Sequence, residues 1–194
     1  MKTFFRAALW LALGVASGSY ADTTVAACNA SESTTYVPPP GMATDAQIDR
    51  IMTDYKVATI LKATMLSHSM DVDVSVVGGA LDELKASSDE DLVRVLLPSL
   101  RGHVSADDAQ KITELLETDS GRAFTNYLAA TVSDPLHAPP RPTLDRETEA
   151  KFKKNGGLAA LKSFATYLQT PACKRQMLMA LLHYITRPQA QANT

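Results

Sequence analysis

The sequence has 194 residues, 45% of them hydrophobic, with a formal net charge of −2. This length fits a single domain with enough chain to bury a core without a metal ion. The slightly acidic balance argues against nucleic acid and against an anionic membrane surface as the main partner, because both attract basic proteins.

The first 21 residues have the three zones of a secretory signal peptide. Lys2 and Arg6 precede an apolar run over residues 7–16, and Ser19–Ala21 places small residues before Asp22. A transmembrane anchor is the alternative, but the run has about half of the roughly 20 residues that span a bilayer, and no later stretch is apolar enough. We therefore expect cleavage near Ala21 and a periplasmic or secreted protein. Cleavage removes two cations and no acid, so the mature net charge becomes −4.

Two cysteines remain in the mature chain, Cys28 and Cys173. Disulfides persist outside the cytoplasm, and a lone exposed thiol is a liability there, so we expect the two to pair. The alternatives are two free thiols or a lipidated Cys28, because Val25–Cys28 is similar to a lipobox. Against lipidation, Asp22 and two threonines separate this segment from the apolar run.

An extended, proline-rich arm is expected over residues 22–43, because the segment is polar and ends in three consecutive prolines and Gly41. Thr44 and Gln47 then form a capping box, which opens a helix. Its apolar stripe continues to Met65, so we expect one helix of about six turns.

Residues 71–77 alternate between polar and apolar types, as a strand does, but an isolated strand is not stable. We therefore expect a turn through Gly78–Gly79 into a helix over residues 80–85. Further along the chain, the start and stop signals predict a helix that is capped by Ser88 and kinked or ended by Pro98. A second helix is capped by Ser105 and interrupted at Asp119–Gly121, and a further helical segment continues through Leu128.

After a loop with four prolines over 134–142, three more helices are predicted. The first is capped by Thr143 and ended by Asn155–Gly157, the second covers residues 158–168, and the last starts at Thr170–Pro171.

The predicted fold class is all-α: a compact bundle of about seven short amphipathic helices with an extended N-terminal arm. Residues 44–186 form a single helical domain, and the polar residues 187–194 form a disordered tail. Nearly every helix has a recognisable cap, so local and global signals agree.

One local pattern occurs twice, in Leu116–Arg122 and in Leu168–Lys174. Each copy combines the end of a helix with a capping threonine and a cation one turn into the next helix. We expect two helix corners in which the threonine hydroxyl satisfies amides of the second helix. The residues of this motif are Thr118, Gly121, Arg122, Thr170, Pro171 and Lys174.

This corner resembles the signature of an exported bacterial family, domain of unknown function 2059. The resemblance is clearest over residues 105–130, where Gly121-Arg122 stands at the family's Gly-Lys. Asp119 departs from the family's proline, and the second copy has Cys173 in place of the glycine. The resemblance covers about a third of the chain. It implies a helical envelope protein and no particular activity.

Metal sites have two weak candidates. Met65, His68 and Met70 with the nearby Asp71 and Asp73 suggest a soft copper site, although residue 70 does not share a helical face with the others. Calcium is the second candidate, with Asp71, Asp73, Ser75, Val77 and Asp82 at the ligand offsets of a 12-residue loop. Val76 replaces its essential glycine, and Asp82 its final glutamate. We expect core packing and solvated side chains instead, and no cofactor or metal.

Catalytic patterns are also weak. The histidines at 68, 103, 137 and 183 are scattered, and no nucleophile motif is present. The carboxylate pairs Glu114–Glu117 and Glu147–Glu149, and the basic run Lys151, Lys153 and Lys154, fit solvated helix faces.

We therefore expect a non-enzymatic exported protein that binds another protein in the cell envelope. A specific version is an immunity or inhibitor protein against an envelope-acting toxin or hydrolase. The alternative is a periplasmic carrier of a lipid or another small apolar ligand.

Overall fold

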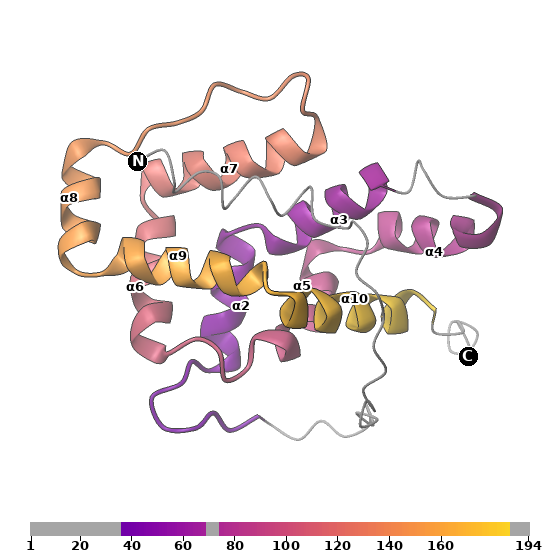
Figure 1. Cartoon of the computed structure of the whole chain (residues 1–194), viewed down its shortest axis with the longest axis horizontal. Helices are drawn as coiled ribbons and strands as arrows, with labels where there is room; N and C mark the ends of the chain where they lie inside the picture. Colours follow the sequence, from indigo (N-terminus) through magenta and orange to yellow (C-terminus); the bar gives the residue numbers. More distant parts are fainter. Residues whose placement is uncertain (1–35, 69–73, 187–194) are drawn as a thin grey trace.

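The computed structural model describes residues 36–68 and 74–186. This part of the chain forms nine α-helices and one short 3-10 helix, with no strand (Figure 1). The helices are α2 (Asp45–Asp54), α3 (Val57–His68), α4 (Val74–Ala86), α5 (Asp89–Leu96), η2 (Leu97–Leu100), α6 (Ala106–Leu116), α7 (Asp119–Ser133), α8 (Arg146–Lys154), α9 (Gly157–Leu168) and α10 (Pro171–Ile185). The all-α prediction is confirmed. The signal peptide, Cys28 and the C-terminal tail lie outside the described residues.

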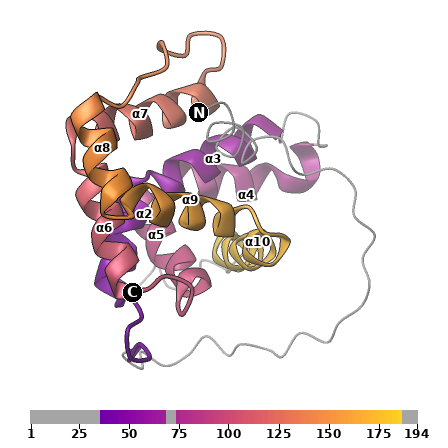
Figure 2. The ribbon, with the colours of Figure 1, turned by 60° about the vertical axis from the view of Figure 1, so that its left-hand side comes forward.

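Helix α6 packs against both α2 and α9, towards one side of the bundle (on the left in Figures 1 and 2). Its inward face is fully apolar, and α2 packs against it with its own buried stripe. The buried residues of these two helices are Ile48, Ile51, Met52, Ala109, Ile112, Leu115 and Leu116. On the other side of α2, helix α5 joins α2 and α3 to α10. The core is therefore built from helices that are far apart in the sequence.

The segment before α2 is joined to the segment before α6 by backbone hydrogen bonds. The Ala43 amide donates to the Val104 carbonyl at 2.9 Å, and the Ala106 amide donates to the Gly41 carbonyl at 2.9 Å. Beside them, the Arg101 guanidinium makes a two-point contact with the Asp45 carboxylate, at 3.0 and 2.7 Å. This segment thus holds the starts of α2 and α6 together.

The first helix is shorter than expected, because the predicted single helix divides into α2 and α3. The chain turns at Tyr55–Lys56, where Lys56 has a φ of 59°. The Tyr55 ring is buried and packs edge-to-face on Phe164, with ring centroids 5.7 Å apart. The break lets α2 pack against α6 while α3 packs against α7. Tertiary packing therefore overrides a continuous helical pattern.

The predicted first residues of two other helices are wrong. Helix α4 begins at Val74 rather than at residue 80, and Gly78 and Gly79 lie inside it. Helix packing against α3 and α10 outweighs the roughly 1 kcal/mol that each helical glycine costs. Helix α8 is capped by Asp145, not Thr143, because the Asp145 carboxylate accepts from the Thr148 amide at 2.8 Å.

The other predicted caps are present. Thr44 and Gln47 form the capping box, and Ser88 and Ser105 accept hydrogen bonds from the third amides of their helices. Pro98 ends α5 in the 3-10 helix η2. Among the described helices, none is both long enough and apolar enough to cross a bilayer.

Candidate functional site

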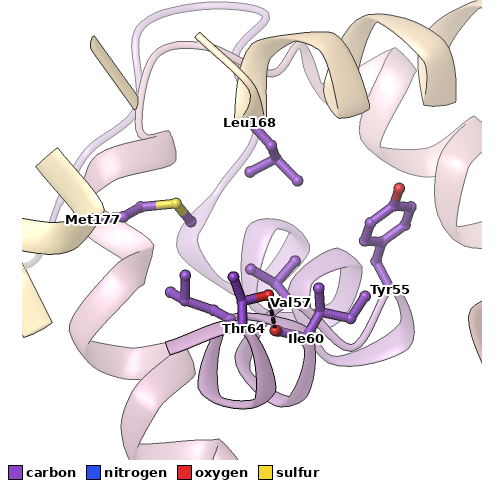
Figure 3. Close-up of a pocket in the computed structure, with 7 residues that line it drawn as sticks. Tyr55, Val57, Ile60, Thr64, Leu168 and Met177 are labelled. Atoms are coloured by element: carbon purple, nitrogen blue, oxygen red, sulfur yellow. Dashed lines mark hydrogen bonds between the residues drawn. The ribbon is translucent and has the colours of Figure 1, made fainter. Parts of the chain in front are cut away.

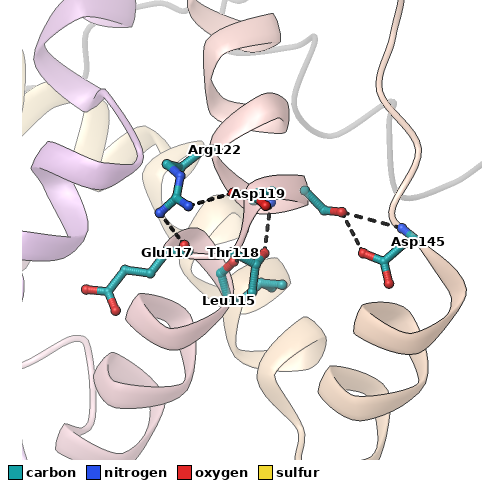
Figure 4. Close-up of polar contacts among 8 residues, drawn as sticks. Leu115, Glu117, Thr118, Asp119, Arg122 and Asp145 are labelled. Atoms are coloured by element: carbon teal, nitrogen blue, oxygen red, sulfur yellow. Dashed lines mark hydrogen bonds and ion pairs between the residues drawn. The ribbon is translucent and has the colours of Figure 1, made fainter.

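The first helix corner joins α6 to α7 through Thr118 (Figure 4). The Thr118 hydroxyl donates to the Leu115 carbonyl at 2.7 Å and accepts from the Gly121 amide at 3.0 Å. One side chain thus satisfies the end of one helix and the start of the next.

The second corner, between α9 and α10, repeats these bonds. The Thr170 hydroxyl donates to the Tyr167 carbonyl at 2.8 Å and accepts from the Cys173 amide at 3.2 Å. Pro171 takes the first helical position, where its missing amide hydrogen costs nothing. The sequence repeat therefore corresponds to two corners with the same hydrogen-bonding pattern.

The two corners differ at the third helical position. At the first corner, a Cβ on Gly121 would lie 2.1 Å from the Leu115 carbonyl oxygen and 2.8 Å from Leu116 Cα. Atoms of the preceding helix leave no space there for any side chain. At the second corner the same position holds Cys173, which is fully buried. The first corner is thus the more tightly closed of the two.

Charged side chains surround the first corner. Arg122 bonds to the Glu117 carbonyl oxygen and, at 2.7 Å, to the Asp119 carboxylate (Figure 4). Arg50 of α2 contacts the Glu117 carboxylate. Burial raises the pKa of Asp54, and the neighbouring Glu117 carboxylate adds to this effect, while Arg50 and Arg122 oppose it. An ionised Asp54 is therefore partly destabilised where it lies.

An apolar pocket of about 470 Å³ borders the first corner. Helices α6, α7, α8 and α9 contribute to it, together with the proline-rich loop between α7 and α8. The lining residues are Leu115, Leu116, Ser120, Gly121, Phe124, Arg141, Pro142, Thr143, Leu144, Glu149, Leu158 and Leu161. The buried floor consists of leucines and Gly121, whereas the polar residues are half-buried or exposed. This arrangement suits a molecule that inserts an apolar body.

The loop over the pocket is fixed at its C-terminal end. The Ser120 hydroxyl donates to the Asp145 carboxylate at 2.8 Å, so the first turn of α7 contacts the cap of α8 (Figure 4). Hydrogen bonds from Thr148 and from Ser120 lower the pKa of Asp145 to about 2. At its other end, the loop begins with a turn in which the His137 ring nitrogen lies 2.8 Å from the Asp134 carboxylate. Its prolines restrict the backbone between these two ends.

A much smaller cavity, about 30 Å³, borders the second corner. In Figure 3, Leu168 and Met177 lie on either side of this corner and face Val57, Ile60 and Thr64 of α3. The Thr64 hydroxyl donates to the Ile60 carbonyl at 2.7 Å. This space is about the volume of one water molecule. It is a packing gap and does not fit an organic ligand.

Cys173 lies in a closed environment. Its sulfur is 3.8 Å from the Met177 sulfur, and the Tyr167 side chain is its neighbour on the other helix. Burial raises the pKa of the thiol to about 11, so the neutral form dominates at neutral pH. Cys173 has a free thiol in the structure, and Cys28 lies outside the described residues. The predicted disulfide therefore stays a prediction.

The remaining candidate residues are spread over the surface. The His103 ring stacks on Tyr167 with centroids 4.2 Å apart. Glu114 accepts from Gln110 at 3.0 Å, and the three lysines of the basic run are exposed at the end of α8. Asp71 and Asp73 lie outside the described residues. Within the described ranges, no three His, Cys, Asp or Glu side chains come together as metal ligands.

The sequence did not predict the pocket or the position of Glu149 beside it. This residue was expected on a solvated face, but it is half-buried and lines the pocket. Thr143, predicted to be a cap, lines the pocket as well. The only sequence signal was the proline-rich loop, whose backbone is restricted and which returns an apolar Leu144 to the bundle.

Compared with known proteins, the chain matches no family model, no curated protein and no solved structure. The resemblance of the corner motif to domain of unknown function 2059 thus stays a hypothesis.

Proposed function

We propose that this chain is an exported carrier that holds a small, largely apolar molecule in the pocket at the first helix corner. The observation that supports it is the pocket itself, with its apolar floor and a volume of about 470 Å³. Small-molecule sites are typically apolar clefts of about 300–1,000 Å³ with a few polar groups at defined places. The signal-peptide pattern of residues 1–21 adds the expectation of a periplasmic or secreted location. Binding of this kind needs no catalytic group, in keeping with the predicted lack of enzymatic activity.

A variant that fills the pocket tests the proposal. Leu158 is half-buried on the pocket wall, so Leu158→Trp places a large ring in the space with little loss of core packing. The matched control is Leu136→Trp, at a loop position that is 91% exposed. The only natural tryptophan, Trp10, lies in the predicted signal peptide, so each mature variant carries a single tryptophan.

The assay measures binding of the fluorescent apolar probe N-phenylnaphthylamine to the mature protein. We expect the wild type and Leu136→Trp to bind it equally, and Leu158→Trp to bind about ten-fold more weakly or worse, because a filled pocket loses its apolar contacts. Native mass spectrometry of protein purified from the cell envelope should show a bound molecule in the wild type. Equal probe binding by all three proteins would contradict the proposal.

Protein binding is the second candidate, and an exposed face of α10 supports it. Leu178, Met179 and Leu182 are 44%, 58% and 39% exposed and lie along the same helix. Apolar residues grouped in this way are typical of interaction surfaces. A partner in the envelope should be captured in a one-to-one complex, and Met179→Lys should abolish that complex.

The immunity version of protein binding predicts that deleting the gene harms cells only while a neighbouring toxin gene is intact.

A further inference from the structure

The buried residues that line the pocket offer a ligand no hydrogen-bonding side chain. They are Leu115, Leu116, Gly121 and Leu161. A polar group pressed against them would lose its hydrogen bonds to water without replacement, which makes its burial unfavourable. The part of a ligand that reaches this floor must therefore be hydrocarbon.

The polar side chains of the lining are half-buried or exposed, and two of them already have partners. Ser120 donates to the Asp145 carboxylate at 2.8 Å, and Arg141, on the exposed loop, has an interaction of its own within the protein. Water still reaches Thr143 and Glu149. A charge contact in such a partly exposed place contributes little to affinity, so the hydrocarbon part of the ligand provides most of it.

The volume of the pocket limits how much hydrocarbon enters. A methylene group is about as large as a water molecule, which takes about 30 Å³ in the liquid. A pocket of about 470 Å³ then has room for about fifteen such groups. This is enough for one acyl chain and too little for the two long chains of a membrane phospholipid.

Given the proposed carrier function, on which this step rests, we infer that the pocket takes a single-chain amphiphile and selects it by the length of its hydrocarbon chain. Each methylene group that enters adds apolar contact until the pocket is full, at about fifteen carbon atoms. Further carbon atoms stay in water with the head group and add no affinity.

Leu158 allows this length to be changed in both directions. It is half-buried on α9 and lines the pocket. Leu158→Ala frees the space of about three methylene groups, and Leu158→Trp fills the space of about six. The matched controls are Leu136→Ala and Leu136→Trp, because Leu136 is 91% exposed and lies outside the lining.

The assay measures binding of monoacylglycerols to the mature protein by isothermal titration calorimetry. Their head group is uncharged and constant, so only the chain varies, in two-carbon steps from about eight to about twenty carbon atoms on both sides of the expected limit. Each is used below the concentration at which it aggregates. A diacylglycerol with two long chains tests the restriction to one chain.

We expect the affinity of the wild type to rise roughly ten-fold for every two carbon atoms and to level off at about fifteen. Leu158→Ala should move this limit about three carbon atoms upward, and Leu158→Trp should move it about six downward. Both Leu136 variants should keep the limit of the wild type. The diacylglycerol should bind more weakly than the monoacylglycerol that fills the pocket.

Failure of this inference and failure of the carrier proposal give different results. If the affinity rises without a limit, if both Leu158 variants keep the limit of the wild type, or if the diacylglycerol binds as tightly, selection by chain length is wrong. The same holds if no monoacylglycerol binds while N-phenylnaphthylamine does, and in all these cases the carrier proposal stands. If neither kind of molecule binds, the carrier proposal itself is wrong.

Discussion

The two helix corners of this protein use the same hydrogen bonds but have different surroundings. At both, a threonine hydroxyl bonds to a carbonyl three residues back and to an amide three residues on. Leu116 precedes the first corner and lines the pocket of about 470 Å³, whereas Leu168 precedes the second and lines the cavity of about 30 Å³. A local motif therefore sets the angle of the chain, and the elements packed around it decide whether a binding site forms.

The third helical position after each capping threonine explains part of the difference between the two corners. Gly121 allows α6 and α7 to approach closely, and it is one of the residues that line the pocket. At the second corner the Cys173 side chain fills the same position against Tyr167 and Met177. Four measurements test the comparison, two at these positions and two at other residues in or beside the corners.

The largest expected effect is the protection of Cys173 from thiol reagents. The thiolate is the reactive form, and both burial and a pKa of about 11 suppress it in the folded state. Alkylation at neutral pH should be slower than in the unfolded chain by on the order of a thousand-fold, since it requires opening of the core. Fast labelling of Cys173 itself in the native protein, as opposed to labelling of Cys28, would contradict the closed environment. Counting thiols after denaturation without reductant tests the predicted Cys28–Cys173 disulfide: two free thiols would show that the pair is absent.

Gly121→Ala should destabilise the protein strongly, because its Cβ would meet the backbone of α6 at 2.1 Å. We expect a loss of about 3 kcal/mol, at the upper end for overpacking. Where Cys173 is a free thiol, as in the structure, Cys173→Ala at the matched position removes one sulfur atom and should cost about 1 kcal/mol. Urea unfolding measures both. Equal losses would show that the two corners are equally tight.

Thr118→Ala and Thr170→Ala should each cost about 1 kcal/mol, the usual value for losing an N-cap. The corresponding serine variants keep the hydroxyl and serve as controls with near-wild-type stability. The two alanine effects should add in the double variant, because the threonines share no hydrogen-bond partner. A double variant that departs from the sum would show that the corners are coupled.

Asp54→Asn should give the smallest effect, a slight stabilisation at neutral pH. Burial and the Glu117 carboxylate raise the pKa of Asp54 in the folded state, so its ionisation opposes folding. The penalty applies above the raised pKa and disappears as the pH falls below the unfolded value of about 4. Thermal unfolding should therefore favour the variant at pH 7 and show no difference near pH 3. A variant that is less stable at pH 7 would contradict this sign.

The sequence predicted those features of the fold that depend on neighbouring residues. The caps at Thr44, Ser88 and Ser105 join residues three apart, so they can be recognised from residue type and spacing alone. The break at Tyr55–Lys56 has no such signal, because its apolar stripe is continuous and the turn contains neither glycine nor proline. It follows from the packing of Tyr55 on Phe164, more than a hundred positions away.

The pocket could not be predicted from the sequence either, because it also depends on contacts between residues far apart in the chain. Leu115, Phe124, Glu149 and Leu161 come from four helices, and no spacing in the chain relates them. The proline-rich loop was recognised as a loop, but its position over these helices depends on the contact between Ser120 and Asp145. A residue such as Glu149 has the same local pattern whether it faces bulk water or a binding site.

The backbone bonds between residues 41–43 and 104–106 have a consequence for biosynthesis. The chain is made from its N-terminus, so α2 cannot reach its final position until residue 106 has been added and the intervening segment has closed on itself. Closing so long a loop carries an entropic cost that only later contacts offset. The earliest helix of the domain must therefore wait for the middle of the chain, and a ribosome-bound fragment shorter than this point has no native partner for its first turn.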